Sequence, residues 1–194
     1  MKNLLVSAAA AASFIAPAAV QAQALPAAVV AVVDLDKVTS DCTACKTAAA
    51  SLKSQASSLQ ARETSLEAPL KTEAQAIQAA IDALGGKQPD AALQARVKAF
   101  QAKQQAGSAE LGAKQQEIQR NQAYIQQQIS AKLGPVYQQV MQRRGANVLV
   151  EAGATLAASA AIDVTADVTA GLNASLPSIS ANAPAQAQQQ PQGR

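Results

Sequence analysis

The chain has 194 residues, of which 49% are hydrophobic but only 2% are aromatic, so the large side chains of a compact core are scarce. It contains no His, which excludes Ser-His-Asp and Cys-His triads, His-ligated zinc sites and haem held by a proximal His. Its net charge of +3 is too small to predict a dedicated nucleic-acid binder.

The amino terminus, residues 1–22, has the pattern of a cleavable signal peptide. A positive charge precedes the uncharged apolar stretch 4–20, and small-x-small sites follow, with cleavage expected after Ala22 or Ala24. The alternative is a transmembrane anchor, but serines and a proline interrupt the stretch and no positive stop-transfer cluster follows it. Export to an ATP-poor, oxidising compartment is therefore predicted, and no Gly-rich phosphate loop is present.

A β-branched run over residues 29–35 predicts a short buried strand, and a long helix is expected to begin near Lys37. From Ala49 onward the apolar residues follow a heptad repeat, which is typical of a coiled-coil seam. The two predicted rows are Ala49, Ala56, Glu63, Leu70, Ile77 and Leu84, and Leu52, Leu59, Leu66, Glu73 and Ala80. Pro69 is expected to kink or loosen this helix.

A turn is predicted over residues 85–90, where two glycines end one helix and Pro-Asp opens the next. The second helix, from about Ala91 to Arg144, then folds back on the first to make an antiparallel hairpin over residues 37–144. Several polar residues and a glycine interrupt its seam, namely Gln104, Gly107, Lys114, Asn121 and Gln128. They indicate either a poor coiled coil or a hydrated, flexible arm.

After the hairpin, residues 147–151 predict a second strand, and residues 155–158 a further short one. A short helix is expected to start within 163–168, with Thr165 or Asp163 as its cap. The Ala-, Gln- and Pro-rich residues 177–194 are expected to be a disordered tail.

Together, the strand 30–34, the long hairpin, the return strand 146–151 and the run Ile162-Asp-Val-Thr-Ala-Asp-Val168 resemble the Skp/OmpH family of periplasmic chaperones. The resemblance implies an α+β, mostly α, fold in which a helical hairpin arm stands on a small β body made of residues 23–36 and 145–176. It also implies a periplasmic homotrimer whose arms surround a cavity for unfolded outer-membrane proteins.

The predicted trimer has a physical reason, because strands this short form a stable sheet only when other strands cover their edges. We expect the trimer body to bury Val29, Val32, Val148 and Val150. No cofactor and no metal site are predicted.

Cys42 and Cys45 form a CxxC pair in an exported chain. One hypothesis is a redox-active pair, as in thioredoxin-like enzymes. The other is a local disulfide, or two thiols at a helix start, and the coiled-coil context favours it because the redox motif expects a βαβ setting.

Five aspartates near predicted helix starts are candidates for a metal cluster or for helix caps. Asp34, Asp36 and Asp41 lack the Gly and the bidentate Glu of a calcium loop, so capping and charge matching are favoured. Asp163 and Asp167 are interpreted in the same way.

The second helix is the basic one, with nine Lys and Arg against three acidic residues over 87–144, whereas 37–84 has five of each. This surplus is either a solvated helix face or an attractive surface for acidic clients and anionic membrane. The candidate contact residues are Arg96, Lys98, Phe100, Lys103, Lys114 and Arg120. Phe100 and Tyr124 are aromatic residues of the arm, and packing is their favoured role.

The sequence thus predicts an ATP-independent holdase that binds unfolded outer-membrane β-barrel proteins, without catalytic residues and without a nucleic-acid partner. Two alternatives stay open. One is a coiled-coil spacer or tethering protein of the cell envelope, and the other is a thiol oxidoreductase that uses Cys42 and Cys45.

Overall fold

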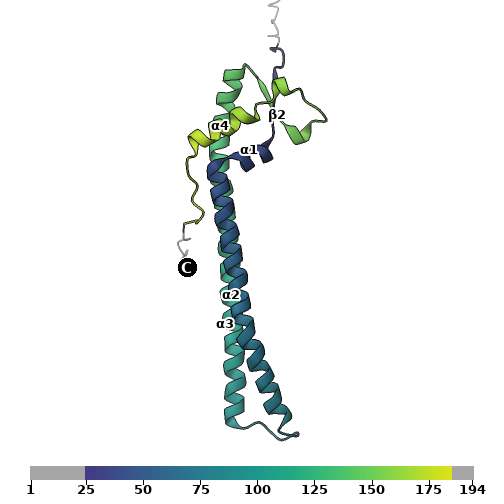
Figure 1. Cartoon of the computed structure of the whole chain (residues 1–194), viewed down its shortest axis with the longest axis vertical. Helices are drawn as coiled ribbons and strands as arrows, with labels where there is room; N and C mark the ends of the chain where they lie inside the picture. Colours follow the sequence, from purple (N-terminus) through teal and green to yellow (C-terminus); the bar gives the residue numbers. More distant parts are fainter. Residues whose placement is uncertain (1–24, 185–194) are drawn as a thin grey trace, which may run out of the picture.

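The computed structural model describes residues 25–184, and it is a long helical hairpin on a small body that contains two strands (Figure 1). The predicted fold class, a helical hairpin arm on a small β body, is confirmed. The predicted signal peptide lies outside the described residues. Within the described part, no helix is long and apolar enough to span a membrane.

The sheet of the body consists of β1 (Val30–Val33) and β2 (Val148–Glu151), which pair in parallel with Val30 opposite Val148. Asn147 fixes the entry to this pairing, because its side chain accepts from the Val29 amide at 2.7 Å and donates to the Ala27 carbonyl at 2.8 Å. Parallel strands need a long crossover connection, and here the whole arm is that connection.

The arm is built from α2 (Thr43–Asp82) and α3 (Ala91–Arg144), which lie side by side and separate toward the tip (Figure 1). At 1.5 Å per residue these helices are about 60 and 80 Å long. Asp90 caps α3 by accepting from the Leu93 amide at 2.8 Å, and Gly145 ends it in the left-handed conformation with φ of 68°.

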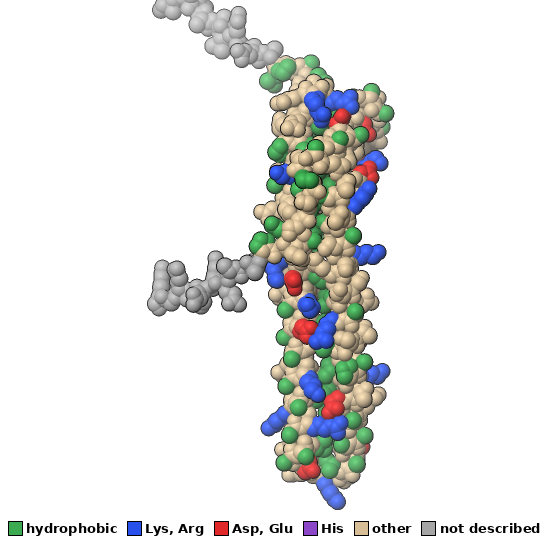
Figure 2. All heavy atoms as spheres, turned by 60° about the vertical axis from the view of Figure 1, so that its left-hand side comes forward, with side chains coloured by type: hydrophobic (Ala, Val, Ile, Leu, Met, Phe, Trp, Pro, Cys, Tyr) green, Lys and Arg blue, Asp and Glu red, His purple; other side chains and the backbone are tan. Residues whose placement is uncertain are grey.

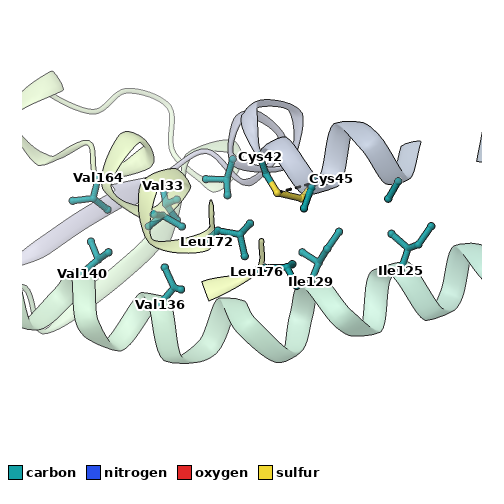
Figure 3. Packing of buried hydrophobic residues seen from close by; sticks show 14 of the residues in the cluster. Val33, Cys42, Cys45, Ile125, Ile129, Val136, Val140, Val164, Leu172 and Leu176 are labelled. Carbon is teal, nitrogen blue, oxygen red and sulfur yellow. Dashed lines mark hydrogen bonds between the residues drawn. A yellow bond between two sulfur atoms is a disulfide. The ribbon is translucent and has the colours of Figure 1, made fainter. Parts of the chain in front are cut away.

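The core lies where the base of the arm meets the short helices α1 (Leu35–Asp41) and α4 (Thr165–Ser175) (Figure 3). Val38, Val140, Val168 and Leu172 are almost fully buried in it. These are small or medium apolar residues, as expected for a chain with so few aromatics. The core therefore fixes the base of the arm, and the distal arm extends away from it.

The run that follows β2 corrects one prediction. Residues 155–158 form no strand. Instead, single turns of 3₁₀-helix, η1 (Ala152–Ala154) and η2 (Ala160–Ile162), flank an irregular loop in which Leu156 is fully exposed. Strands are stabilised by side-chain packing against neighbouring strands, and Leu156 has no such neighbour among the described residues. The residues around it are mostly Ala, which is a weak strand former.

The carboxyl-terminal segment 177–184, which we call the strap, corrects a second prediction. It is ordered along the base of the arm, with Ile179 and Ala181 packed against the core (Figure 1). The strap has too few large apolar residues to form a core of its own. It is held instead by packing against the arm and by hydrogen bonds with arm side chains. The rest of the predicted tail, 185–194, lies outside the described residues.

Candidate functional site

The apolar seam of the arm is only half-buried over most of its length, because two helices alone cannot cover it from every side. Ile77, Ile125 and Ile129 are buried. The half-buried large apolar residues of the two helices include Leu52, Leu59, Leu66, Leu70, Leu93, Val97, Phe100, Leu111 and Ile118. A long strip of apolar surface is thus accessible from the sides of the arm.

One of the two rows predicted for the first helix is displaced by one residue at the base of the arm, whereas the other row, Leu52, Leu59 and Leu66, is half-buried as predicted. Ala48 is 1% exposed whereas Ala49 is exposed, and Gln55 is half-buried whereas Ala56 is exposed. From Leu70 onward the displaced row is again buried or half-buried at its predicted positions. The change of phase falls beside the proline at position 69, and an extra four-residue step of this kind locally unwinds a coiled coil.

Two bidentate ion pairs join the helices on either side of this change of phase. Arg62 donates to Glu110 at 2.7 and 2.9 Å, and Arg96 donates to Glu73 at 2.7 and 3.3 Å. The hydrogen bond from its arginine is the main reason that the pKa of each glutamate lies below the usual 4.5. The pairs are well over a third exposed at their arginine ends, so they set the register of the helices more than they stabilise them.

Between these ion pairs lies a hollow of about 380 Å³, lined on its apolar side by Leu66, Pro69 and Leu70. Gly107 of α3 forms part of its wall, and a Cβ there would lie 3.6 Å from Leu66. A second, open hollow of about 460 Å³ lies beside Phe100 and Leu70. Both hollows open to solvent along the side of the arm, and the charged residues that line the first belong to the two ion pairs, apart from Lys103.

The predicted basic contact residues do not gather at one place. Arg96 is engaged with Glu73, whereas Lys98, Lys103, Lys114 and Arg120 are exposed at separate points along α3. Figure 2 shows basic and acidic side chains interspersed along the arm, with apolar side chains between them. The arrangement provides a distributed positive field instead of a pocket for one anion.

The four valines predicted for a trimer body differ in exposure within the single chain. Val32 is 5% exposed and Val150 is half-buried, but Val29 and Val148 are 48% and 38% exposed. Val30 and Ile162, with Leu156 of the loop, add to this exposed apolar surface of the body. Within the described residues, no strand other than β1 pairs with β2.

Cys42 and Cys45 form a disulfide at the junction of α1 and α2 (Figure 3). Cys42 is the N-cap of α2, and its sulfur accepts from the Cys45 amide at 3.2 Å. The two residues are 0% and 7% exposed, so a partner thiolate would reach either sulfur only after the junction opens. Asn173 of α4 reinforces the junction, because its side chain accepts from the Thr43 amide at 2.9 Å.

The aspartates act as caps and ion-pair partners. Asp34 caps α1 through the Lys37 amide, and Asp41 pairs with Lys37 and Lys46. Asp36 lies in the first turn of α1. Among residues 25–184, no three Cys, Asp or Glu side chains lie close enough together to hold a metal ion.

The Asp163-to-Val168 run holds the body together. The Asp163 carboxylate accepts from the Thr165 hydroxyl and amide, the latter at 2.8 Å, and these bonds lower its pKa. The Thr165 hydroxyl accepts from the Asp34 amide at 3.0 Å. Asp167 pairs with Arg144 at 2.6 Å, and Val168 is fully buried. The run thus ties β1, α3 and α4 to one another.

Sequence reasoning missed the contact between the arm and the strap. Asn121 and Gln128, which look like defects in the seam of the second helix, hydrogen-bond to the strap backbone. Asn121 is 2% exposed and also donates to Gln55 of α2 at 2.9 Å. The one available signal was their position, because polar amides at the same position of two consecutive heptads need hydrogen-bond partners if they are buried.

Residues 29–172 match the family model described as outer membrane protein (OmpH-like). The fold is also similar to the crystal structure of a candidate outer membrane chaperone (OmpH-like) from Caulobacter crescentus CB15, with a TM-score of 0.66 and 25% sequence identity. That match covers 82% of this chain and 93% of the other. No curated protein matches the sequence. The family match begins beside β1, spans the whole arm and ends within α4, and the chain therefore belongs to the OmpH-like outer membrane protein family.

Proposed function

We propose that the chain is an ATP-independent holdase of the periplasm that binds unfolded outer-membrane β-barrel proteins and prevents their aggregation. Family membership and the structural similarity to a candidate outer membrane chaperone support a chaperone role. The proposal names the class of client and a passive mode of action, in which binding alone keeps the client in solution.

The observation that carries the proposal is the half-buried seam of the arm. Leucines, isoleucines and Phe100 lie in a long strip that is reachable from the side, among glutamines and charged residues. An unfolded barrel protein offers alternating apolar and polar residues without a fixed shape. Many weak contacts along such a strip suit this client better than one deep pocket does.

The function is proposed for a homotrimer. The exposed valines of the body, Val29 and Val148, give each subunit an apolar surface that a neighbouring subunit would cover. Three arms from one body act together, because linking weak sites raises the effective concentration of each. The exposed lysines of α3 would draw acidic clients toward the arms and provide a weak contact with anionic membrane.

The test is light scattering of a denatured outer-membrane barrel protein diluted into buffer that contains the signal-free chain and no nucleotide. Suppression of scattering at a few arms per client is the expected result. Aggregation at the same rate as with an equal mass of an unrelated coiled coil would contradict the proposal, and would favour the alternative of a spacer or tether.

A parallel insulin-reduction assay tests the thiol oxidoreductase alternative. We expect no acceleration by the chain, because both cysteines are buried at a helix junction. Acceleration that is lost in the Cys42→Ser, Cys45→Ala variant would instead show a redox activity.

A further inference from the structure

The strap is held to the arm by five hydrogen bonds with arm side chains, four of which involve the strap backbone. Gln128 and Ser180 exchange two of them, with the Gln128 amide donating to the Ser180 carbonyl at 2.9 Å and accepting from the Ser180 N–H at 3.0 Å. Asn121 accepts from the Ala183 N–H at 2.8 Å, and Gln55 donates to the Ala181 carbonyl at 3.3 Å.

Only the longest of the five, from the Gln55 amide to Asn182 Oδ1 at 3.4 Å, ends on a strap side chain, and the other four end on the strap backbone. Every residue except proline carries the same backbone N–H and carbonyl, so these contacts select an extended chain and not a side-chain sequence. Recognition of main-chain groups is also how exposed sheet edges bind extended peptides. The strap side chains add less selectivity, because beyond Ile179 they are small or exposed, and Asn182 alone among them accepts a long hydrogen bond from an arm side chain.

The buried oxygen of Asn121 needs a hydrogen-bond donor, and in the free chain the strap backbone supplies it. The amide nitrogen of Asn121 is already used by Gln55, and its oxygen takes the Ala183 N–H while the side chain is 2% exposed. A buried acceptor that loses its donor is destabilised until another donor or a water replaces it. An incoming extended chain supplies such donors.

The path of the strap continues toward the tip of the arm as a hollow of about 220 Å³, which begins at Asn182. Its walls combine apolar residues, Leu59 and Ile118, with polar ones, Ser58, Lys114 and Glu117. A polypeptide longer than the strap therefore has further surface to follow in the same direction.

We propose that Gln55, Asn121 and Gln128 form a binding site for extended polypeptide backbone, that the strap occupies this site in the free chain, and that an extended segment of an unfolded client displaces it. The inference rests on the proposed holdase function and assigns one site of client contact to the base of the arm. Among the described residues the strap is covalently joined to the fold at Leu176, so its release requires the loss of its hydrogen bonds and of the packing of Ile179 and Ala181 against the core, but not unfolding of the helices. While the strap is docked, clients cannot bind the site. The apparent affinity for clients is therefore the intrinsic affinity multiplied by the fraction of molecules in which the site is free.

The test weakens the docking of the strap without changing the residues of the site. In the full-length mature chain, Ser180→Pro with Ala183→Pro removes both strap N–H donors and leaves the arm unchanged. The matched control is Ser178→Pro, which places a proline in the same segment at a residue whose N–H makes no hydrogen bond to the described part of the arm. The probe is a fluorescein-labelled peptide with the sequence of residues 177–184, and binding is measured by fluorescence anisotropy.

We expect the double-proline variant to bind the peptide about tenfold more tightly than the wild type or the control, as for a strap that is docked in about nine of ten molecules. Adding Asn121→Ala and Gln128→Ala to that variant should remove the gain. Equal peptide affinity in the double-proline variant and the control would overturn the proposal.

Hydrogen exchange provides the second measurement. The amides of Ser180 and Ala183 should be protected in the free chain and lose protection when an unfolded barrel protein is added. If aggregation is suppressed while these amides stay protected, the proposed displacement is wrong and the holdase function stands. If the peptide result holds but the wild type suppresses no aggregation, the site exists and the holdase function is wrong.

Discussion

Gly171 of α4 lies so close to Val136 of α3 that a Cβ atom at position 171 would be 2.8 Å from Val136 Cγ1. Val136 is 2% exposed, and its β-branched side chain has little rotamer freedom in a helix. The absence of a side chain at position 171 is therefore what allows α4 to pack on the base of the arm. This contact joins the body to the arm as directly as the Arg144–Asp167 ion pair does.

The first prediction is that Gly171→Ala destabilises the protein. Overpacking costs about 1–3 kcal/mol, and the higher helix propensity of Ala recovers about 1 kcal/mol of it, so a net loss of about 1 kcal/mol in unfolding free energy is expected. Thermal unfolding of the signal-free chain measures it.

Gly112→Ala is the matched control, because Gly112 is also helical but has nothing within 4 Å of the added Cβ. It should raise the unfolding temperature. A rise for both variants would show that α4 shifts on the arm at little cost, and that the Gly171–Val136 contact is not tight.

The second prediction is that the disulfide is dispensable for holding clients. Cys42→Ser keeps an oxygen that can accept from the Cys45 amide as the N-cap of α2, and Cys45→Ala keeps a small apolar side chain in the core. The closed loop is short, so its removal should cost about 2 kcal/mol or less by chain entropy.

Urea unfolding gives the loss of stability, and light scattering with a denatured barrel protein gives the retained activity. Loss of client holding by a variant that remains folded and keeps its oligomeric state would point to a direct role of the disulfide.

The third prediction concerns pH. Arg62 and Arg96 lower the pKa of Glu110 and Glu73 in the folded arm, so their contribution to arm stability is complete above the usual value of 4.5 and is lost as the pH falls below it. Hydrogen exchange of the distal arm should therefore accelerate between pH 6 and pH 3.5, after correction for the intrinsic rate. The Glu73→Gln, Glu110→Gln variant should show a smaller change.

Glu63→Gln is the control, since Glu63 is exposed and makes no ion pair with the described residues. It should follow the wild-type profile. An identical pH response in all three proteins would mean that the two cross-arm ion pairs contribute nothing measurable to the arm.

The sequence was sufficient for the elements whose signals are local. The valine runs at 30–33 and 148–151 predict strands because β-branched residues favour them, and the two glycines at 85 and 86 end a helix because both have positive φ. One of the two predicted heptad rows was wrong by one residue at the base of the arm, because Ala48 and Ala49 are equally apolar. Only the packing against α3 distinguishes them.

The strap could not be predicted because its hydrogen bonds join side chains on the two arm helices to backbone groups more than 50 residues away. Backbone N–H groups are common to all residues except proline, so the sequence does not show which of them are bound. The Ala, Ser and Pro residues of the strap also follow no helical or strand periodicity. The strand predicted over residues 155–158 was wrong for a different reason. Leu156 between small residues suggests a strand, but the structure forms none there.

The fourth prediction tests the trimer at the body. Val148 is 38% exposed and lies on β2, where a neighbouring subunit would cover it, so Val148→Lys should place a charge in the interface and dissociate the assembly. Ile81 near the arm tip is 40% exposed, and Ile81→Lys is the matched control that should remain trimeric. Multi-angle light scattering measures the mass. A wild-type chain that is folded and monomeric at micromolar concentration would exclude the proposed trimer.

The last prediction concerns the positive surplus of α3. Exposed charges act through a field that salt screens over about 8–10 Å near physiological ionic strength, and Lys98, Lys103 and Lys114 are exposed at separate points along the helix. Reversing all three to Glu should slow the capture of an acidic unfolded barrel protein clearly at low salt, whereas any single reversal should slow it only slightly. Stopped-flow association at two salt concentrations measures this for wild type and variants. If the triple variant captures the client as fast as the wild type at low salt, the lysines are only a solvated face of the helix and capture depends on the apolar seam alone.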